Sequence, residues 1–529
     1  MARIELTQLY GGIYGWPGNL FNSVSDSKVL ERNATTFTYR LGESSGFEDF
    51  QLRVTGSRFR YDADEAVGGR IGRIVITNDK GQDVLTLSEF GKKGAAGSFS
   101  EFWVNLFGAP SDDAGPGPNA KTVWSMLMSG NDTIIGSAGN DFRALVGVDA
   151  GRDTYRMGAG DDEVAGGIGN DTYDGGEGRD LIGFRETHFS EGDGMFRGIR
   201  ANIALGVIHD PWGGRDKITG FEDLGGSRLS DRLVGDDATA GNAFSGYRGH
   251  DIIDGGADSY DAAGKRLDDV QDWLRYHDDY WLGGTRGIVA DLEVTVENGS
   301  IRGQVRDPYG HIDRVIDIEH ISGTRFNDRF SGSGADNRFI GGEGKDWFDG
   351  GTGLDIVDFS RQFTGAKQGG IRVDLGRDGG QIKNDGFGNV EDAWGIDGII
   401  GTYLGDEIAG GQYGERFVGG NGNDTLTGGG GADVFLWNSD AEVGESDLIR
   451  DFKSGEDFLA FEVSRFGGMT KSLHLANDWA LSSGEGTFIF DRSASTLYWD
   501  ADGNGGGDPR IVAVLQGVTS LNAGDFQLL

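Results

Sequence analysis

Residues 166–183 read GGIGNDTYD GGEGRDLIG, a nine-residue unit written twice. Each unit has glycine at its first, second and fourth places, aspartate at its sixth place and an apolar residue at its eighth. The units before it keep the same spacing, so that Asp153, Asp162, Asp171 and Asp180 fall nine residues apart. A fixed period of this kind predicts a repeat architecture in which every unit folds in the same way.

The residue pattern of the unit predicts a turn over its first six residues and a short strand over its last three. Glycine at places one, two and four permits positive φ, and the eighth side chain points inward because side chains alternate along a strand. Two units make one full turn of a parallel β-roll. Asp162 and Asp180 should therefore stack on one edge, and Asp153 and Asp171 on the other.

The sixth-place aspartates are the candidate metal ligands. Ca²⁺ binds six to eight oxygens from carboxylates and backbone carbonyls, so we expect several calcium ions between stacked turns, with the best-formed sites in the first block. A solvated acidic face is the alternative, but the register with glycine and an apolar eighth place argues against it. The predicted ligands are Asp132, Asp141, Asp153, Asp162, Asp171, Asp180, Asp251, Asp328, Asp346, Asp355, Asp406, Asp424 and Asp433.

Three inserts interrupt the repeats, and each has a β-like run followed by a short acidic segment, such as ITGFEDLGG at 218–226. We expect the inserts to form small β hairpins at the side of a broken roll. Asn337 and Glu415 replace the aspartate in two units, which should weaken those sites. The expected boundaries are an N-terminal β module at 1–125, β-roll blocks at 126–183, 225–258, 323–358 and 401–436, inserts at 184–224, 259–322 and 359–400, and a C-terminal cap with a secretion signal at 437–529.

The ends of the chain are not repetitive. Alternating runs at 35–40 and 50–62 predict antiparallel strands, 100–107 and 122–128 could be short helices, and 111–121 reads as a linker. The segment after Leu436 is placed to cap the last strands of the solenoid. The expected fold class is all-β: an interrupted parallel β-roll solenoid with β inserts, an N-terminal antiparallel β module and a C-terminal β cap.

The composition of the 529 residues narrows the function. A formal net charge of −37 disfavours nucleic acid as a partner and favours divalent cations. The chain has no cysteine, which excludes disulfides and thiolate metal sites. Residues 1–20 do not read as a signal peptide, and no apolar run approaches the length of a membrane span. Extracellular calcium modules fill at roughly 0.1–1 mM, which favours an extracellular location.

Three other motifs are weaker. Asp500, Asp502 and Asn504 resemble the start of a helix–loop–helix calcium loop, but the flanks read as strands and a hairpin turn is the better interpretation. Residues 42–46 match G-x-S-x-G without the helix that this motif needs. Aromatic and acidic residues crowd the second insert and suggest either a sugar site or the insert's own core. They are Trp273, Tyr276, His277, Asp278, Asp279, Tyr280 and Trp281.

Several stretches resemble known families. GGNGNDTLTGGGGADVF at 419–435 looks like the repeats of hemolysin-type (repeat-in-toxin) proteins, and DLIRDFKSGEDFLAF at 447–461 is similar to the C-terminal domain of serralysin-type secreted proteins. The resemblance implies export by the type I secretion machinery through an uncleaved C-terminal signal, and folding on extracellular calcium. Serralysins carry H-E-x-x-H, which none of the seven histidines here forms, so protease activity is not carried over.

The sequence thus predicts a secreted calcium-binding protein with a structural or adhesive role. Its β-roll folds on binding extracellular Ca²⁺, and the chain could assemble with copies of itself at the cell surface or in a matrix. The alternative is a secreted protein that binds or cleaves polysaccharide, with its site in the N-terminal module or the second insert. The sequence leaves enzymatic activity open and favours its absence.

Overall fold

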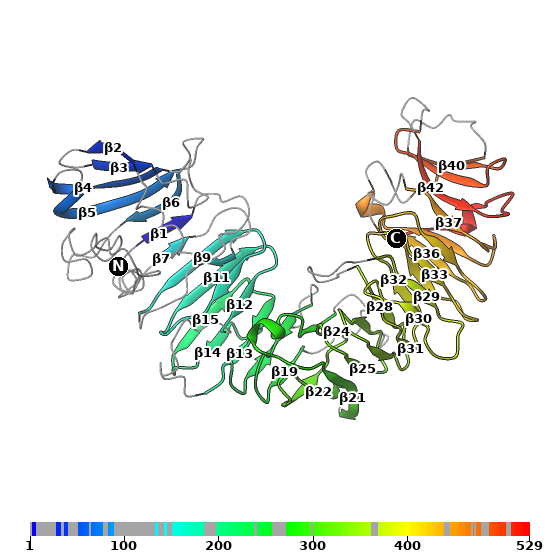
Figure 1. The fold of residues 1–529 in the computed structure, drawn as a ribbon, viewed down its shortest axis with the longest axis horizontal. Helices are drawn as coiled ribbons and strands as arrows, with labels where there is room; N and C mark the ends of the chain where they lie inside the picture. The colour runs from blue at the N-terminus through cyan, green and yellow to red at the C-terminus, as the bar shows by residue number, and fades with distance from the viewer. Residues whose placement is uncertain are drawn as a thin grey trace. The chain divides into compact units, whose positions relative to one another are not determined.

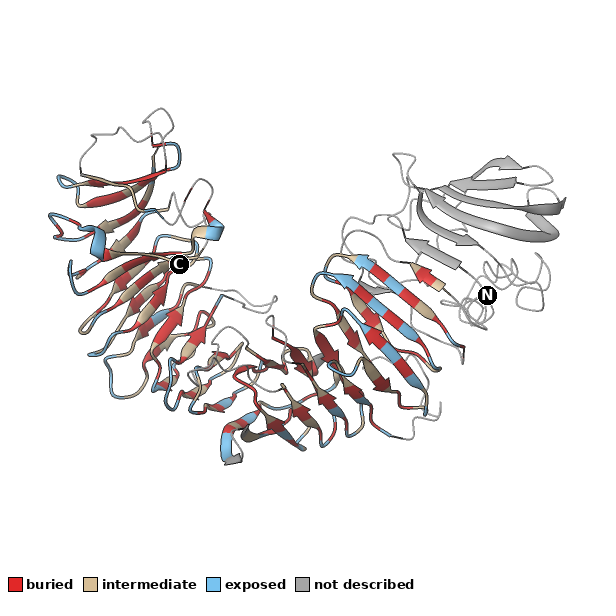
Figure 2. Ribbon diagram, turned by 180° about the vertical axis from the view of Figure 1, so that it is seen from behind, coloured by how far each residue is buried: buried red, intermediate tan, exposed pale blue. Residues whose placement is uncertain are grey.

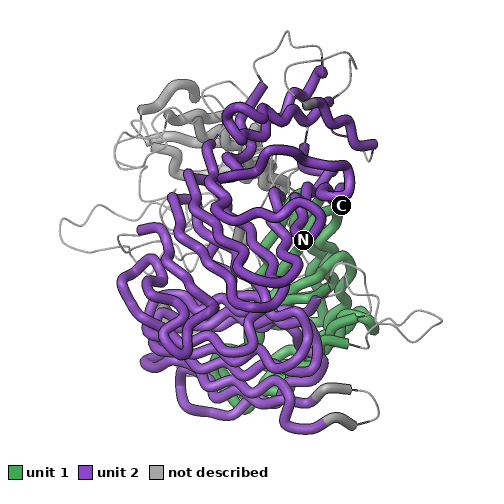
Figure 3. The backbone as a smooth tube through the Cα atoms, turned by 90° about the vertical axis from the view of Figure 1, so that its right-hand side faces the viewer, with its two compact units in different colours: residues 1–270 green, residues 271–529 purple. Residues whose placement is uncertain are grey.

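The computed structural model divides the chain into two units, Met1–Val270 and Gln271–Leu529 (Figure 3), which are described one at a time. Before residue 151 the structure describes the strands alone. The described residues are 3–6, 28–32, 36–40, 51–62, 65–77, 83–88, 133–135, 142–144, 151–184, 197–236, 241–256, 271–297, 300–360, 369–438, 445–466, 469, 472–477, 486–503 and 509–529.

The N-terminal module is an antiparallel sheet, as its alternating sequence predicts. Its neighbours run in the order β2-β3-β4-β5-β6-β1, all antiparallel. The strands are β1 (Arg3–Leu6), β2 (Lys28–Arg32), β3 (Thr36–Arg40), β4 (Gln51–Asp62), β5 (Glu65–Thr77) and β6 (Asp83–Ser88). The predicted helices and the linker at 111–121 lie outside the described residues.

The first block forms the expected parallel roll. β9 (Thr154–Ala159) pairs in parallel with β11 (Thr172–Glu177), and β10 (Glu163–Ala165) pairs in parallel with β12 (Leu181–Gly183) in a second sheet. The eighth-place side chains of all four strands are buried between the sheets, and the rings of Tyr155 and Tyr173 stack at 4.6 Å. Figure 2 shows the resulting alternation of buried and more exposed residues along the strands.

The first insert lies within the sheet. β13 (Arg200–Asn202), β14 (Val207–His209) and β15 (Arg215–Thr219) form an antiparallel meander. β15 pairs in parallel with β11, and β13 pairs in parallel with β17 (Arg232–Val234), so the sheet runs β11-β15-β14-β13-β17 (Figure 1). The expectation of hairpins at the side of a broken roll is wrong. The outer strands of a three-stranded meander are parallel to each other, so the meander can join a parallel sheet without leaving backbone groups unpaired.

The inserts of the second unit repeat this construction. β21 (Val289–Glu297), β22 (Ser300–Arg306) and β23 (Ile312–Ile316) form one meander, and β29 (Arg372–Asp374) and β30 (Ile382–Asn384) form the antiparallel hairpin of the other, next to β31 (Asp392–Trp394). Parallel pairing joins β21 to β25 (Arg329–Ser331), β29 to β33 (Glu407–Ala409) and β31 to β27 (Trp347–Asp349).

The other sheet of the second unit is parallel throughout. Stacked phenylalanines fill the space beneath it, and the rings of Phe330 and Phe348 lie 5.1 Å apart. Its strands, in order, are β20 (Trp273–Arg275), β24 (His320–Ser322), β26 (Arg338–Ile340), β28 (Ile356–Asp358), β32 (Gly398–Ile400), β34 (Arg416–Val418), β36 (Val434–Trp437), β38 (Phe458–Phe461) and β43 (Phe526–Leu528).

The C-terminal segment caps the roll as expected. β33 continues in parallel through β35 (Thr425–Thr427), β37 (Asp447–Ile449) and β42 (Arg510–Leu515). β42 then pairs antiparallel with β41 (Thr496–Asp500), which pairs antiparallel with β40 (Thr487–Asp491). The described helices are short 3-10 turns, and no helix among the described residues is long and apolar enough to cross a membrane.

Candidate calcium centres

The sixth-place aspartates form two stacked rows. Asp171 accepts the backbone N–H of Asp153 on Oδ1 at 2.8 Å, and Asp180 accepts that of Asp162 in the same way at 2.8 Å. Each carboxylate is buried and accepts the amide of the equivalent residue one turn earlier. We name these rows the carboxylate ladder. They confirm the predicted edges, with Asp153 and Asp171 on one and Asp162 and Asp180 on the other.

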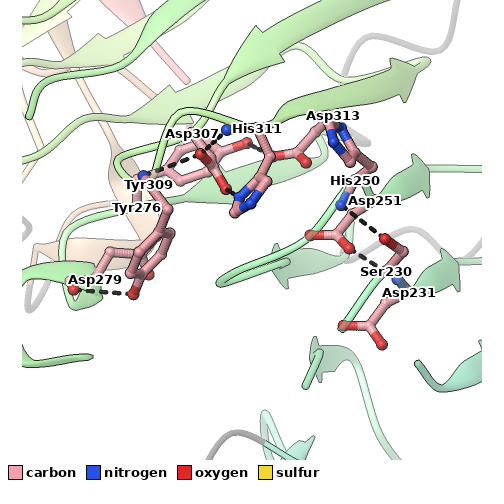
Figure 4. A network of polar contacts seen from close by, with 10 residues as sticks. All are labelled: Ser230, Asp231, His250, Asp251, Tyr276, Asp279, Asp307, Tyr309, His311 and Asp313. Carbon is pink, nitrogen blue, oxygen red and sulfur yellow. Dashed lines mark hydrogen bonds and ion pairs between the residues drawn. The ribbon is translucent and has the colours of Figure 1, made fainter. Parts of the chain in front are cut away.

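The ladder continues through the other blocks. Asp251 accepts the amide of Asp231 at 2.8 Å (Figure 4), and Asp355 accepts the amide of Asn337 at 2.8 Å. The same bond joins Asp346 to Asp328, Asp424 to Asp406 and Asp433 to Glu415. Asp132 and Asp141 lie outside the described residues.

Acidic residues of the inserts and the cap continue the carboxylate ladder. They are absent from the predicted list of calcium ligands. Asp216 accepts the amide of Asp171 at 2.8 Å, across a separation of 45 residues. Six further acidic side chains accept a ladder amide in the same way. The pairs, with the acceptor first, are Glu222 and Asp180, Glu319 and Asp272, Glu391 and Asp346, Asp397 and Asp355, Asp447 and Asp424, and Asp457 and Asp433. The signal that could have found several of them is the acidic segment before each block, whose period differs from nine because the meander intervenes.

Many ladder carboxylates keep one buried oxygen with no hydrogen-bond donor in the described part of the chain. The atoms are Oδ2 of Asp180, Asp216, Asp346, Asp355 and Asp424, and Oε2 of Glu415. A buried charged oxygen without a partner is costly to folding. A hard divalent cation at these oxygens would offset that cost.

The first-place glycine leaves room beside these oxygens. A Cβ at Gly350 would lie 2.2 Å from the carbonyl oxygen of Gly395 and 2.6 Å from Oδ2 of Asp355. Positive φ is found at places two and four, with 97° at Gly351 and 127° at Gly353. The expectation of positive φ at place one is therefore wrong for this turn: the requirement at that place is space for a carbonyl and a carboxylate.

Burial raises the pKa of the ladder carboxyls. The pKa of Asp216 and that of Asp424 rise to about 8, mainly because burial penalises the charged form, and neighbouring carboxylates add to the rise. Burial also raises the pKa of Asp346 well above its ordinary range. A bound cation would favour the ionised form of each group.

The donor set fits calcium. No group of three or more His, Asp or Glu side chains that could hold a metal ion is found among the described residues. A site here must combine one or two carboxylates with backbone carbonyls, which is a donor set that Ca²⁺ accepts. Asp180, Asp346, Asp355 and Asp424, with the carbonyls of the adjoining turns, would hold the ions. Calcium supplies charge compensation and crosslinks between turns.

The described part of the acidic motif at 500–504 is a polar turn. Oδ1 of Asp500 accepts the amides of Asp502 and Gly503, as in a polar turn between the antiparallel strands β41 and β42. This agrees with the hairpin interpretation, and Asn504 lies outside the described residues. The G-x-S-x-G match at 42–46 also lies outside them.

The aromatic cluster of the second insert contributes to its core. Tyr276 is buried, and its hydroxyl donates to Oδ2 of Asp313 at 2.9 Å. Tyr309 donates its hydroxyl to the carbonyl of Asp279, and its amide donates to Oδ1 of Asp307 (Figure 4). Trp273 packs against the ring of His320 at 4.8 Å. The side chains of Tyr280 and Trp281 lie outside the described residues.

Family models match two parts of the chain. RTX calcium-binding nonapeptide repeats match residues 128–142, 149–182 and 322–357, and the peptidase M10 serralysin C-terminal domain matches residues 395–526. The chain carries RTX repeats and a serralysin-type C-terminal domain. RTX repeats bind Ca²⁺, and the two matched domains indicate a secreted protein of the kind exported by type I secretion. Neither match includes a protease domain.

The comparisons with whole proteins add little. No curated protein matches the sequence. Among solved structures, the extracellular lipase LipA from Serratia marcescens matches with 14% identity and a TM-score of 0.19, over 75% of this chain. The match spans 40% of the lipase chain. The RTX assignment therefore rests on the family models and on the geometry of the ladder.

Proposed function

We propose that this chain is a secreted structural or adhesive protein whose RTX roll becomes rigid on binding extracellular Ca²⁺ and then associates with other copies at the cell surface or in a matrix. The carboxylate ladder carries the proposal. It runs through blocks and inserts in each unit and continues into the cap in the second, so the ions that it holds would stabilise each unit along its length.

Exposed apolar side chains on the turns of the second unit support a role in contacts. Tyr413 is 80% exposed and Tyr403 is 55% exposed, and both lie on turns of the fourth block. Large apolar side chains in such positions can contribute to association with another surface. The formal charge of −37 opposes association of the chains without calcium.

Static light scattering during a calcium titration tests the proposal. The purified chain is titrated from chelator to millimolar Ca²⁺, with Mg²⁺ as the ionic control. We expect the mass to remain that of a monomer in chelator and in Mg²⁺, and to grow in Ca²⁺. The double variant Tyr403→Ser, Tyr413→Ser should assemble less while keeping the wild-type circular dichroism spectrum.

A chain that folds on calcium but stays monomeric would contradict the assembly proposal. In that case binding to polysaccharide becomes the function to test, because the second insert places aromatic residues next to carboxylates in the sequence WLRYHDDYW at 273–281. Retention of the calcium-loaded chain on immobilised polysaccharides, compared with the Trp281→Ala variant, would measure it.

A further inference from the structure

The first turn after each insert combines a hydroxyl residue at its second place with an aspartate at its sixth. These three turns read GSRLSD (226–231), GTRFND (323–328) and GTYLGD (401–406), with a hydroxyl residue at the second place instead of glycine. Every insert is followed by such a turn. Ser137 and Ser333 hold the same place in two turns that follow no insert, and Asn337 replaces the aspartate in the second of these. We name these three the hydroxyl turns.

The hydroxyl of each turn donates to its own ladder carboxylate. Oγ1 of Thr324 lies 3.0 Å from Oδ1 of Asp328, and Oγ1 of Thr402 lies 3.0 Å from Oδ1 of Asp406. The same bond in the first unit joins Ser227 to Asp231 at 2.8 Å. Each hydroxyl also accepts the amide of the fourth-place residue, at 2.9–3.1 Å.

Backbone amides supply the remaining donors. The second-place N–H donates to Oδ2 of the carboxylate, at 2.7 Å in Asp328 and 2.6 Å in both Asp406 and Asp231. A further amide, from an isoleucine just before the first strand of the insert, donates to Oδ1. These amides are Ile199 to Asp231 at 2.6 Å, Ile288 to Asp328 at 2.6 Å and Ile371 to Asp406 at 2.7 Å.

The two kinds of turn therefore differ in their open ligand positions. Asp346, Asp355 and Asp424 each keep a buried Oδ2 without a donor in the described part of the chain. In the hydroxyl turns both carboxylate oxygens accept hydrogen bonds from within the protein. A second-place glycine with positive φ, such as Gly342 at 95°, also lacks the hydroxyl that would satisfy the carboxylate.

We propose that the hydroxyl turns are calcium-independent clamps: the Ser or Thr hydroxyl replaces the ion, and Asp231, Asp328 and Asp406 tie the first strand of each meander to the next block without metal. The clamps hold β13 to β17, β21 to β25 and β29 to β33. This inference rests on the calcium-binding roll of the proposed function. It removes Asp328 and Asp406 from the predicted set of calcium ligands.

Calcium stoichiometry of the full-length protein tests the ligand part. Equilibrium dialysis counts the ions bound to wild type, to the double variant Asp328→Asn, Asp406→Asn and to the control Asp346→Asn, Asp424→Asn. We expect the first variant to bind as many ions as wild type and the control to bind fewer. Loss of ions in the first variant, with its circular dichroism spectrum in calcium unchanged, overturns the proposal.

Hydrogen exchange in chelator tests the clamp itself. We expect the double variant Thr324→Gly, Thr402→Gly to exchange the amides of Ile288 and Ile371 about tenfold faster than wild type, because each carboxylate loses a charge-assisted hydrogen bond. Thr324→Ser with Thr402→Ser should preserve protection, as Ser227 does in the first unit. The control Thr352→Gly changes an exposed third-place residue.

Unchanged exchange in the Thr→Gly variant, or no protection of these amides in wild-type chelated protein, overturns the clamp. The outcome is independent of assembly. A chain that fails to grow in mass on calcium contradicts the proposed function, whereas a calcium count that falls in Asp328→Asn, Asp406→Asn contradicts only the clamp.

Discussion

The first-place glycine has a steric role. At Gly350 the carbonyl of Gly395 and the carboxylate of Asp355 occupy the space that a side chain would need. Neither neighbour can move easily, because the carbonyl belongs to an adjacent turn and the carboxylate is held by the amide of Asn337. Any side chain at this place must displace part of the ladder.

We expect Gly350→Ala to lower the free energy of unfolding of the calcium-loaded protein by about 1–3 kcal/mol, as overpacking does. Urea denaturation followed by circular dichroism measures the change. Gly524→Ala is the control, because a Cβ there meets nothing within 4 Å. Equal midpoints for the two variants would contradict the steric explanation.

Asn337 shows how the ladder tolerates a neutral residue. Its side-chain amide donates to the carbonyl of Glu319 at 2.9 Å and to the hydroxyl of Ser333 at 3.2 Å. A carboxylate cannot donate these bonds, and it would face the carbonyl instead. The sixth place therefore also accepts a neutral residue, whose side chain is held by hydrogen bonds within the protein.

We expect Asn337→Asp to destabilise the metal-free protein at pH 8 by about 1–3 kcal/mol, because a buried acceptor loses its donor. Asn327→Asp is the matched control, since the Asn327 side chain accepts the exposed amide of Lys345 and donates no hydrogen bond to a described residue. Thermal unfolding in chelator compares the two. A variant as stable as its control would show that the donor at residue 337 is dispensable.

The antiparallel meander allows an insert to lie within a parallel sheet. Its middle strand pairs with both outer strands, and each outer strand pairs in parallel with a strand of the roll. In the first unit that middle strand is β14, and its central residue Ile208 is fully buried. A substitution that displaces β14 would therefore interrupt the hydrogen bonding of the sheet.

We expect Ile208→Ala to cost about 2–5 kcal/mol, the range for truncating a buried isoleucine. Leu205→Ala, at a residue that is 76% exposed in the neighbouring turn, should change stability by less than about 0.5 kcal/mol. Urea denaturation of the calcium-loaded chain measures both. A small effect of Ile208→Ala would indicate that the meander packs independently of the roll.

The acid load of the whole chain links stability to pH. The pKa values of Asp216 and Asp424 rise from 3.8 to about 8 in the folded chain because of burial. Between these values the folded chain binds more protons than the unfolded chain, so the free energy of unfolding falls as pH rises. A cation that binds the ionised carboxylates reverses this trend.

In chelator we therefore expect a lower melting temperature at pH 8 than at pH 5. In millimolar Ca²⁺ the difference should shrink or change sign, because calcium competes with protons for the same oxygens. Differential scanning calorimetry at both pH values measures it. Greater stability at pH 8 in chelator would contradict the assigned direction of the pKa shifts.

Calcium should also control how much of the chain is folded. Ions that bind only the folded roll add their binding free energy to its stability, so we expect β signal in circular dichroism to increase strongly from chelator to millimolar Ca²⁺. The circular dichroism signal that remains in chelator should come from segments whose buried polar groups are all hydrogen-bonded within the protein. A spectrum that excess chelator leaves unchanged would contradict this dependence.

Local repetition made much of this protein predictable from its sequence. The nine-residue period specifies which side chain points inward and which carboxylates share an edge, because both follow from the alternation of a strand and from two units per turn. Tyr155 and Tyr173 stack, and Asp153 lies over Asp171, as that spacing requires. The N-terminal antiparallel sheet could be predicted from the alternation of apolar and polar residues, and the C-terminal cap from the need to cover the last strands of the solenoid.

Tertiary structure alone decided how the inserts join the roll and which carboxylates remain open. Asp171 meets Asp216 across 45 residues, a separation set by the length of the meander and not by the nonapeptide period. Asp328 and Asp346 occupy the same place in their units, yet the hydroxyl of Thr324 satisfies the first and no described donor reaches Oδ2 of the second. That difference depends on hydrogen-bond geometry, which a pattern of residue types does not contain.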